Sequence, residues 1–174
     1  MREIRIEKLT LNIGAGKEQA VLDKGLILLK NITGIDPVKT ITQKRIAGWG
    51  LRPGLPIGCK ITLRREEAIK LARRLLAAKN SILSKSNFDE EGNVSFGIKE
   101  YIDIPDVKYE PKIGIIGLQA SVTLERPGFR IKKRKILKRV LPRNHRISRQ
   151  ESIDFMKKNF TIKIKEEEQA DQQA

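Results

Sequence analysis

The side chains best suited to chemistry lie in one basic stretch, residues 44–65, which contains no acidic residue. This stretch holds six Lys or Arg residues, the only tryptophan, Trp49, and the only cysteine, Cys59. Cations neutralise phosphates, and an exposed aromatic ring can stack on a base. The composition therefore predicts a polyanion-binding segment; the alternative is a solvated hairpin tip with Trp49 folded back onto the body.

No catalytic or metal site is indicated elsewhere. Cys59 and His145 are the single Cys and the single His of the chain, and they are far apart. One cysteine excludes an internal disulfide, and this pair is too sparse for a zinc site. A lone cysteine also fits a reducing compartment, so we expect a cytoplasmic protein. No nucleophile is indicated by spacing and no carboxylate pair lies on a common predicted face, so we expect no enzymatic activity.

A glycine-rich turn at residues 14–17 follows a predicted strand and precedes a predicted helix, where a phosphate-binding loop would lie. The spacing fits no such loop, because a dinucleotide fingerprint needs glycine in place of Gln19. A Walker loop needs glycine in place of Leu11 and Ser or Thr in place of Glu18. The pattern indicates a tight turn and no cofactor.

The charge balance restricts the kind of partner. The chain has 174 residues, a net charge of +15 and a pI of about 10.1. A protein this basic usually binds nucleic acid and less often a membrane surface. No apolar run approaches the roughly 20 residues that span a bilayer, so we expect no membrane partner. The competing class is an enzyme or nucleotide-binding protein that uses residues 14–17, and a third class is a chromosome-binding or membrane-surface protein held by charge alone.

The basic stretch must be positioned by regular elements. Alternating polarity predicts strands, and apolar residues at helical spacing predict helices. The predicted strands are 8–13, 38–41, 59–64, 94–98, 115–125 and 161–165. The predicted helices are 17–32, which Thr33 and Gly34 end, one beginning after Arg65, and one opened by a capping box of Ser148 and Glu151.

The first strand has a polar outer row. Leu9, Leu11 and Ile13 share the buried phase, whereas Lys8 and the residues that alternate after it point outward. The apolar phase switches near Lys8, which predicts a β-bulge. The outer row is either a plain solvated sheet face or a docking face for RNA.

A second basic segment, residues 126–149, has eleven Lys or Arg residues and no acidic one. Such runs are usually solvated or disordered without a partner. Apolar residues recur within it at Ile131, Ile136, Leu137, Val140 and Leu141, which is compatible with partial helix formation on a partner. Residues 166–174 form an acidic tail that we expect to be disordered.

Several motifs in a fixed order resemble one family: KLTLNIGAG at 8–16, ITG at 32–34 with PV at 37–38, IAGW at 46–49, GLPIGCKITLR at 54–64, FGIKE at 96–100, GIIG at 114–117 and RPGFR at 126–130. They are similar to large-subunit ribosomal protein five, the universal family that binds 5S rRNA, in its archaeal and eukaryotic branch. The resemblance covers most of residues 4–165.

The resemblance implies an α+β fold. It consists of an antiparallel sheet of about five strands with helices packed on one face and a long basic loop between the second and third strands. We expect a single domain over residues 1–165. The implied partners are 5S rRNA and large-subunit rRNA in the central protuberance, the peptidyl-site tRNA through the 46–58 loop, and neighbouring ribosomal proteins.

The expected contacts follow from the motifs and from the basic segments. Expected rRNA contacts are Lys8, Thr10, Asn12, Lys44, Arg45, Trp49, Lys60, Thr62, Arg64, Arg130, Lys132, Lys133 and Arg134. Expected tRNA contacts, at the loop tip, are Gly50, Leu51, Arg52, Pro53 and Gly54. The chain departs from the family in two places: Ile35 replaces a common Gln, and Trp49 replaces a common Phe while keeping an aromatic ring.

Overall fold

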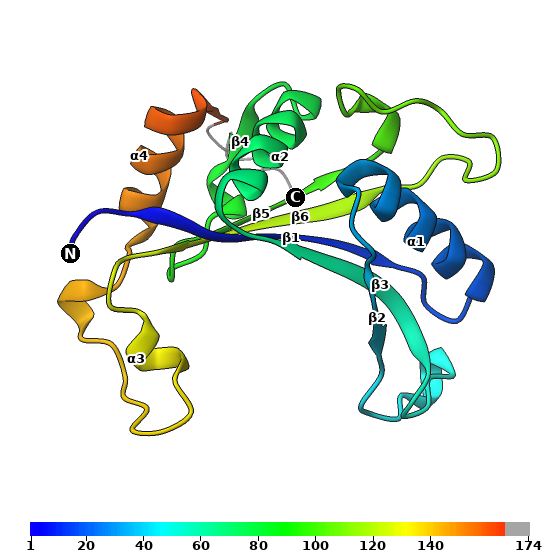
Figure 1. Ribbon diagram of the computed structural model, residues 1–174, viewed down its shortest axis with the longest axis horizontal. Helices are drawn as coiled ribbons and strands as arrows, with labels where there is room; N and C mark the ends of the chain where they lie inside the picture. Colours follow the sequence, from blue (N-terminus) through cyan, green and yellow to red (C-terminus); the bar gives the residue numbers. More distant parts are fainter. Residues whose placement is uncertain (166–174) are drawn as a thin grey trace, which may run out of the picture.

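The computed structural model describes residues 1–165, and the predicted acidic tail lies outside that part of the chain. Its centre is a five-stranded antiparallel sheet in the order β2-β3-β1-β6-β5 (Figure 1). The strands are β1 (Arg5–Gly14), β2 (Val38–Ile41), β3 (Pro56–Leu63), β5 (Asn93–Ile98) and β6 (Leu118–Glu125). The predicted fold class is confirmed, and the long basic loop connects β2 to β3.

The central strand β1 follows its sequence pattern closely. Leu9, Leu11 and Ile13 are almost fully buried, and the strand pairs with β3 on one side and β6 on the other. The β1–β6 register shifts between Ile6 and Lys8, which confirms the predicted bulge. The bulge matters because it changes which side chains of β1 reach each face.

The longer helices cover one face of the sheet (Figure 1). They are α1 (Gln19–Thr33), α2 (Arg65–Ala78) and α4 (Arg149–Phe160). Two of their boundaries follow signals in the sequence: α1 stops at Gly34, which adopts a left-handed conformation, and α4 starts with the predicted capping box of Ser148 and Glu151. The apolar stripes of α1, α2 and α4 join the inward rows of the strands in one core.

The core also decides the state of the only thiol. Cys59 is fully buried beneath α1, and a Cβ added at Gly25 would lie 3.0 Å from its Sγ. Burial raises the pKa of Cys59 to about 11, so the thiol is neutral at physiological pH. Glycine lets the helix backbone approach the strand closely. Cys59 therefore serves packing and not chemistry.

Three details differ from the sequence prediction. The predicted 115–125 strand begins only at Leu118, and Ile115 is 66% exposed. The predicted third strand begins earlier than expected, at Pro56. The last strand, β7 (Lys163–Lys165), pairs in parallel with the unpredicted β4 (Ile82–Ser84) in a separate small sheet. Strands this short carry too few residues to show a period.

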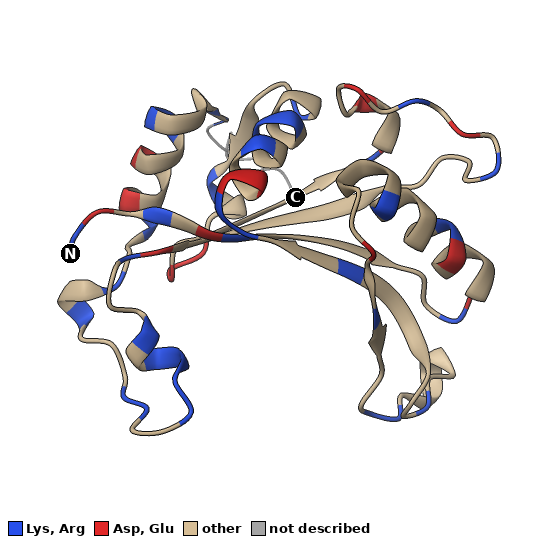
Figure 2. Ribbon diagram, viewed as in Figure 1, with Lys and Arg blue, Asp and Glu red and all other residues tan. Residues whose placement is uncertain are grey.

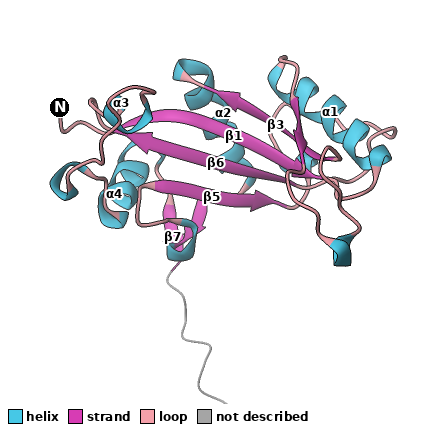
Figure 3. Cartoon of the chain, turned by 90° about the horizontal axis from the view of Figure 1, so that it is seen from below, coloured by secondary structure: helices cyan, strands magenta, loops and turns pink. Residues whose placement is uncertain are grey.

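Two basic projections extend on the side opposite the longer helices (Figures 1 and 2). One is the basic loop, residues 42–55, which contains the turn η1 (Ala47–Trp49). The other is the basic arm, residues 126–147, which contains α3 (Arg130–Lys133) and η4 (Arg143–His145). The remaining short turns are η2 (Lys85–Asn87) and η3 (Tyr101–Asp103). Because the projections stand at opposite ends of the sheet, the uncovered sheet face lies between them (Figure 3).

Candidate nucleic-acid interface

The uncovered face of the sheet is built from the outward rows of its strands. Strand pairing places Thr10 opposite Thr62 of β3, and Asn12 opposite Lys60. These residues and Lys8 were predicted from the sequence, and the structure brings them together at the middle of the sheet. Cross-strand neighbours lie roughly 5 Å apart, so one ligand can contact several of them at once.

The other half of this face was not among the predicted contacts. Asn12 also lies opposite Gln119 of β6, and its amide donates a hydrogen bond of 3.4 Å to the Gln119 side chain. Thr10 lies opposite Ser121, whose hydroxyl is 3.0 Å from that of Ser95 on β5. The signal was present, because these β6 residues alternate with buried apolar ones. What was missing was the knowledge that β6 lies beside β1.

The chemistry of this face suits RNA better than a simple polyanion. Its central rows carry hydroxyls, amides and lysine ammonium groups, and no carboxylate: Lys8, Thr10, Asn12, Lys60, Thr62, Ser95, Gln119, Ser121 and Thr123. Lysines attract phosphates, and hydroxyls and amides hydrogen-bond to ribose 2′-hydroxyls and unpaired base edges. The arrangement can therefore recognise features that charge alone does not read.

The basic loop is a folded projection held by its own backbone. Thr42 and Leu55 are joined at its base by a hydrogen bond of 2.9 Å from the Thr42 amide. Nearer the tip, Ile46 and Leu51 exchange backbone hydrogen bonds of 3.0 and 3.1 Å. Trp49 is 66% exposed, so the alternative in which its ring folds back onto the body is wrong. A rigid stem with an exposed indole suits stacking on an unpaired base.

The expected tRNA contacts, residues 50–54, all lie in this loop, but they are not equally available. Arg52 is exposed, whereas Leu51 is only 5% exposed. Leu51 can therefore offer only backbone atoms to a partner. Lys17, which the sequence placed in a turn, lies against the loop, because a Cβ at Gly50 would be 3.1 Å from its Nζ. Lys17 is a cation that the sequence analysis missed.

The basic arm presents its cations differently. Lys132 pairs with Glu91 at 2.9 Å, and Lys133 pairs with both Glu7 at 2.6 Å and Glu125 at 2.9 Å. Arg134 donates from its Nε to the carbonyl oxygen of Leu137 at 2.8 Å. Of the four expected contacts in the arm, only Arg130 has a side chain without an ion pair or hydrogen bond to residues 1–165, the part that the structure describes. Arg64 of the sheet edge likewise pairs with Glu7, at 3.4 Å.

These pairs shift the proton affinity of the groups involved. Burial alone would lower the pKa of Lys133, but its hydrogen bonds and charge attraction to Glu7 and Glu125 raise it above its ordinary value. Burial alone would raise the pKa of Glu125, but Lys133 and Arg5 lower it. Both groups are therefore firmly charged at neutral pH.

The root of the arm is anchored in the body. The Arg126 side chain is 6% exposed, pairs with Glu151 at 2.6 Å and donates to the carbonyl of Arg146 at 3.2 Å. The Ser148 backbone N–H and Arg126 lower the pKa of Glu151. Leu141 and Ile147 are also buried. The expectation that residues 126–149 lack structure without a partner is not met in the structure, because acidic residues elsewhere in the chain neutralise part of the run.

The remaining reactive groups have structural roles. The His145 ring lies edge-on to Phe129 with centroids 5.6 Å apart, and its Nε2 is 2.9 Å from the carbonyl oxygen of Pro127. Within residues 1–165 there is no group of His, Cys, Asp and Glu that could hold a metal. In the same range no helix is long and apolar enough to cross a membrane.

Comparison with known proteins points the same way as the geometry. Residues 1–52 match the family described as ribosomal protein L5, and residues 56–155 match the C-terminus of the same ribosomal family. The chain is 46% identical to large ribosomal subunit protein uL5 of Sulfolobus acidocaldarius over 95% of this chain and 93% of that protein. It is 47% identical to uL5 of Nanoarchaeum equitans over 94% and 97%, and 43% identical to uL5 of Methanobrevibacter smithii over 93% and 95%.

Proposed function

Because this chain belongs to the ribosomal protein L5 family, we propose that its uncovered sheet face and its two basic projections bind 5S rRNA and large-subunit rRNA. Like its uL5 relatives, the chain is a structural constituent of the large ribosomal subunit. It is not an enzyme. In this proposal residues 1–165 act as one RNA-binding domain in the cytoplasmic ribosome. Its neighbours there are the other proteins of the central protuberance.

One observation carries the proposal: a sheet face whose central rows are polar and hold no carboxylate lies between two cationic projections (Figures 2 and 3). A generic polyanion binder needs only the cations. The hydroxyl and amide rows on β1, β3, β5 and β6 add groups that distinguish folded RNA from a plain duplex. The failed phosphate-loop spacing at residues 14–17 leaves nucleotide binding without support.

The first experiment is binding to 5S rRNA and to a length-matched unrelated RNA across a salt titration. Purely electrostatic binding weakens steeply toward about 200 mM salt, so a preference that persists there supports specific recognition. Equal affinities at every salt concentration would leave only a generic polyanion binder and would overturn the proposal.

Two substitutions test the sheet face directly. Asn12→Ala and Thr62→Ala remove hydrogen-bonding groups from partly or fully exposed positions, so we expect weaker 5S rRNA binding with little loss of folding stability. Parallel losses of thermal stability and affinity would instead show that these side chains support the fold.

We further propose that the basic loop contacts the peptidyl-site tRNA. Since Ile46 and Leu51 are paired through their backbones, residues 47–50 can be replaced by an Asn-Gly turn without cutting the stem. Combined with Arg52→Ala, this variant should keep most of its 5S rRNA binding, because the sheet face and the basic arm are unchanged, and should lose tRNA retention on the ribosome. Loss of both activities would refute a division of roles between the loop and the sheet.

A further inference from the structure

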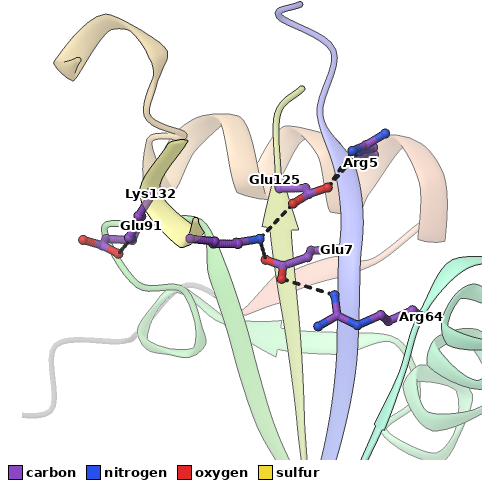
Figure 4. Close-up of polar contacts among 7 residues, drawn as sticks. Arg5, Glu7, Arg64, Glu91, Glu125 and Lys132 are labelled. Atoms are coloured by element: carbon purple, nitrogen blue, oxygen red, sulfur yellow. Dashed lines mark hydrogen bonds and ion pairs between the residues drawn. The ribbon is translucent and has the colours of Figure 1, made fainter. Parts of the chain in front are cut away.

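Lys133 of the basic arm lies between two carboxylates of the sheet. Its ammonium is 2.6 Å from Glu7 of β1 and 2.9 Å from Glu125 of β6. The other oxygens of the same carboxylates are engaged as well, by Arg64 at 3.4 Å and by Arg5 at 2.7 Å (Figure 4). We call these five residues the ionic cluster.

The cluster depends on the bulge in β1. Ile6 lies opposite Leu124, and Lys8 lies opposite the next β6 residue, Thr123, so Glu7 is the extra residue between two regular pairs. A bulge re-aims side chains and strengthens the local twist. Here the bulged strand directs Glu7 to the same lysine that Glu125 binds, at the end of the sheet from which the arm departs (Figure 4).

Burial in the cluster is uneven. The side chains of Glu7 and Glu125 are only 9% and 15% exposed, whereas that of Lys133 is 42% exposed. A poorly solvated carboxylate requires a cationic partner, but an ammonium that is nearly half exposed does not require a carboxylate. The two carboxylates therefore need Lys133 more than Lys133 needs them, and the consequence of the pairing is that the arm is attached to the sheet.

The arm needs such an attachment, because its outer part has little else to hold it. Residues 130–140 are all exposed, and α3 has only four residues, far fewer than an isolated helix needs. Consecutive lysines bind acidic residues on two sides, Lys132 to Glu91 and Lys133 to the ionic cluster. The buried residues of the arm lie only near its ends, at Arg126, Leu141 and Ile147.

We propose that Glu7 and Glu125 are positioning residues for RNA binding. Their ion pairs with Lys133 hold the basic arm at a fixed angle beside the sheet face. The inference rests on the proposed rRNA-binding function and adds a role for two acidic residues whose negative charge repels phosphates. A held arm binds with a smaller loss of conformational entropy than a free one. The exposed cations of the arm that make no ion pair within the described chain, such as Lys135 and Lys138, are then already placed for phosphates.

The test asks whether removing two negative charges strengthens or weakens RNA binding. Replacing an acidic residue in a protein that binds a polyanion should tighten binding if only charge matters. The double variant Glu7→Gln/Glu125→Gln raises the net charge by two but releases Lys133. We expect its affinity for 5S rRNA to fall by roughly tenfold, the scale on which ordering one or two mobile side chains acts.

The matched control is Glu90→Gln/Glu100→Gln, which makes the same change in net charge. Both residues are exposed, and the side chain of neither makes an ion pair or hydrogen bond within the described chain. This control should bind 5S rRNA as tightly as the parent or more tightly. If the Glu7/Glu125 variant behaves like the control, the positioning role is overturned.

A second readout does not involve RNA. Trypsin should cut the RNA-free Glu7/Glu125 variant faster within residues 126–147 than it cuts the parent, while the temperature of global unfolding falls by only about 2–4 °C. Unchanged cleavage would overturn the proposal. If the double variant fails to fold, the 5S rRNA affinities of Lys133→Gln and Lys135→Gln can be compared instead. Each removes one cation, but only Lys133→Gln opens the ionic cluster, so Lys133→Gln should weaken 5S rRNA binding more than Lys135→Gln does.

Failure of this inference can be distinguished from failure of the proposed function. If the parent chain shows no preference for 5S rRNA, the function itself is wrong whatever the variants do. If the parent keeps its preference and the Glu7/Glu125 variant binds equally well with an equally protected arm, only the positioning role is lost. Lys133→Arg keeps the charge and can keep both carboxylate partners. If Lys133→Arg keeps the affinity and the protection from trypsin that Lys133→Gln loses, the inference is supported.

Discussion

The basic loop and the basic arm extend from opposite ends of the same sheet, yet they hold their charges in different ways. The loop is shaped by backbone hydrogen bonds, and its cations Lys44, Arg45 and Arg52 make no ion pair with the described residues. The arm is shaped largely by ion pairs between its own cations and carboxylates of the body, such as Lys132 with Glu91. The number of Lys and Arg residues in a segment therefore does not show how many of them are free to bind a partner.

The comparison also separates stability from binding. Changes in the arm should affect the fold and the RNA together, because the same side chains serve both. Changes at the loop tip should affect binding alone, because the tip adds only Leu51 to the buried residues.

The largest effect should come from the root of the arm. Glu151→Ala leaves the buried Arg126 guanidinium without its carboxylate and removes half of the α4 capping box. We expect a loss of about 2–3 kcal/mol in the free energy of unfolding, measured by urea denaturation. Asp154→Ala, on an exposed position of the same helix, should change stability by less than about 0.5 kcal/mol. Equal effects would show that the Arg126–Glu151 pair does not anchor the arm.

Trp49→Ala should give the opposite pattern in the loop. The indole is 66% exposed, so stability should stay within about 0.5 kcal/mol of the parent. Binding to the RNA that the loop contacts should weaken by about 1–3 kcal/mol, the contribution of one stacked base. Trp49→Phe keeps an aromatic ring and should keep most of the affinity that Trp49→Ala loses. A filter-binding assay measures both variants. A loss of stability as large as the loss of affinity would contradict the separation drawn above.

A smaller effect should appear on acidification. The folded-state pKa of Glu125 lies below its ordinary value of 4.5, so its ion pairs stabilise the fold above that value and are lost as pH falls through the lowered pKa. Glu125→Gln should therefore flatten the acid side of the stability curve by up to about 1 kcal/mol. Thermal unfolding of both proteins from pH 7 to pH 3 measures this difference, and parallel curves would rule out a stabilising role for the pairs.

The smallest effect compares single cations of the two projections. Lys44→Ala removes a cation that makes no ion pair in the described chain, and its loss should reduce the salt slope of RNA binding by about 1. Lys132→Ala removes a cation already paired with Glu91, so its slope should change less. If Lys132→Ala changes the slope as much as Lys44→Ala, the pair with Glu91 opens when RNA binds.

Local pattern alone determined much of this protein. Alternation in residues 8–13 predicted both the buried row of β1 and its polar row, and the change of phase near Lys8 predicted the bulge. The capping box at Ser148 and the glycine at position 34 predicted helix boundaries that the structure confirms. These features depend on periods and caps within a few residues, which is the range over which sequence is directly informative.

Only the tertiary structure decided which of these local features meet. Ser121 and Gln119 join the RNA-facing rows because β6 lies beside β1, more than 100 residues apart in the chain. Lys133 is a free cation in the sequence and a clamped one in the fold, since Glu7 and Glu125 reach it only when the two strands pair. Ion pairing and strand order depend on distance in space, and a sequence pattern reports only distance along the chain.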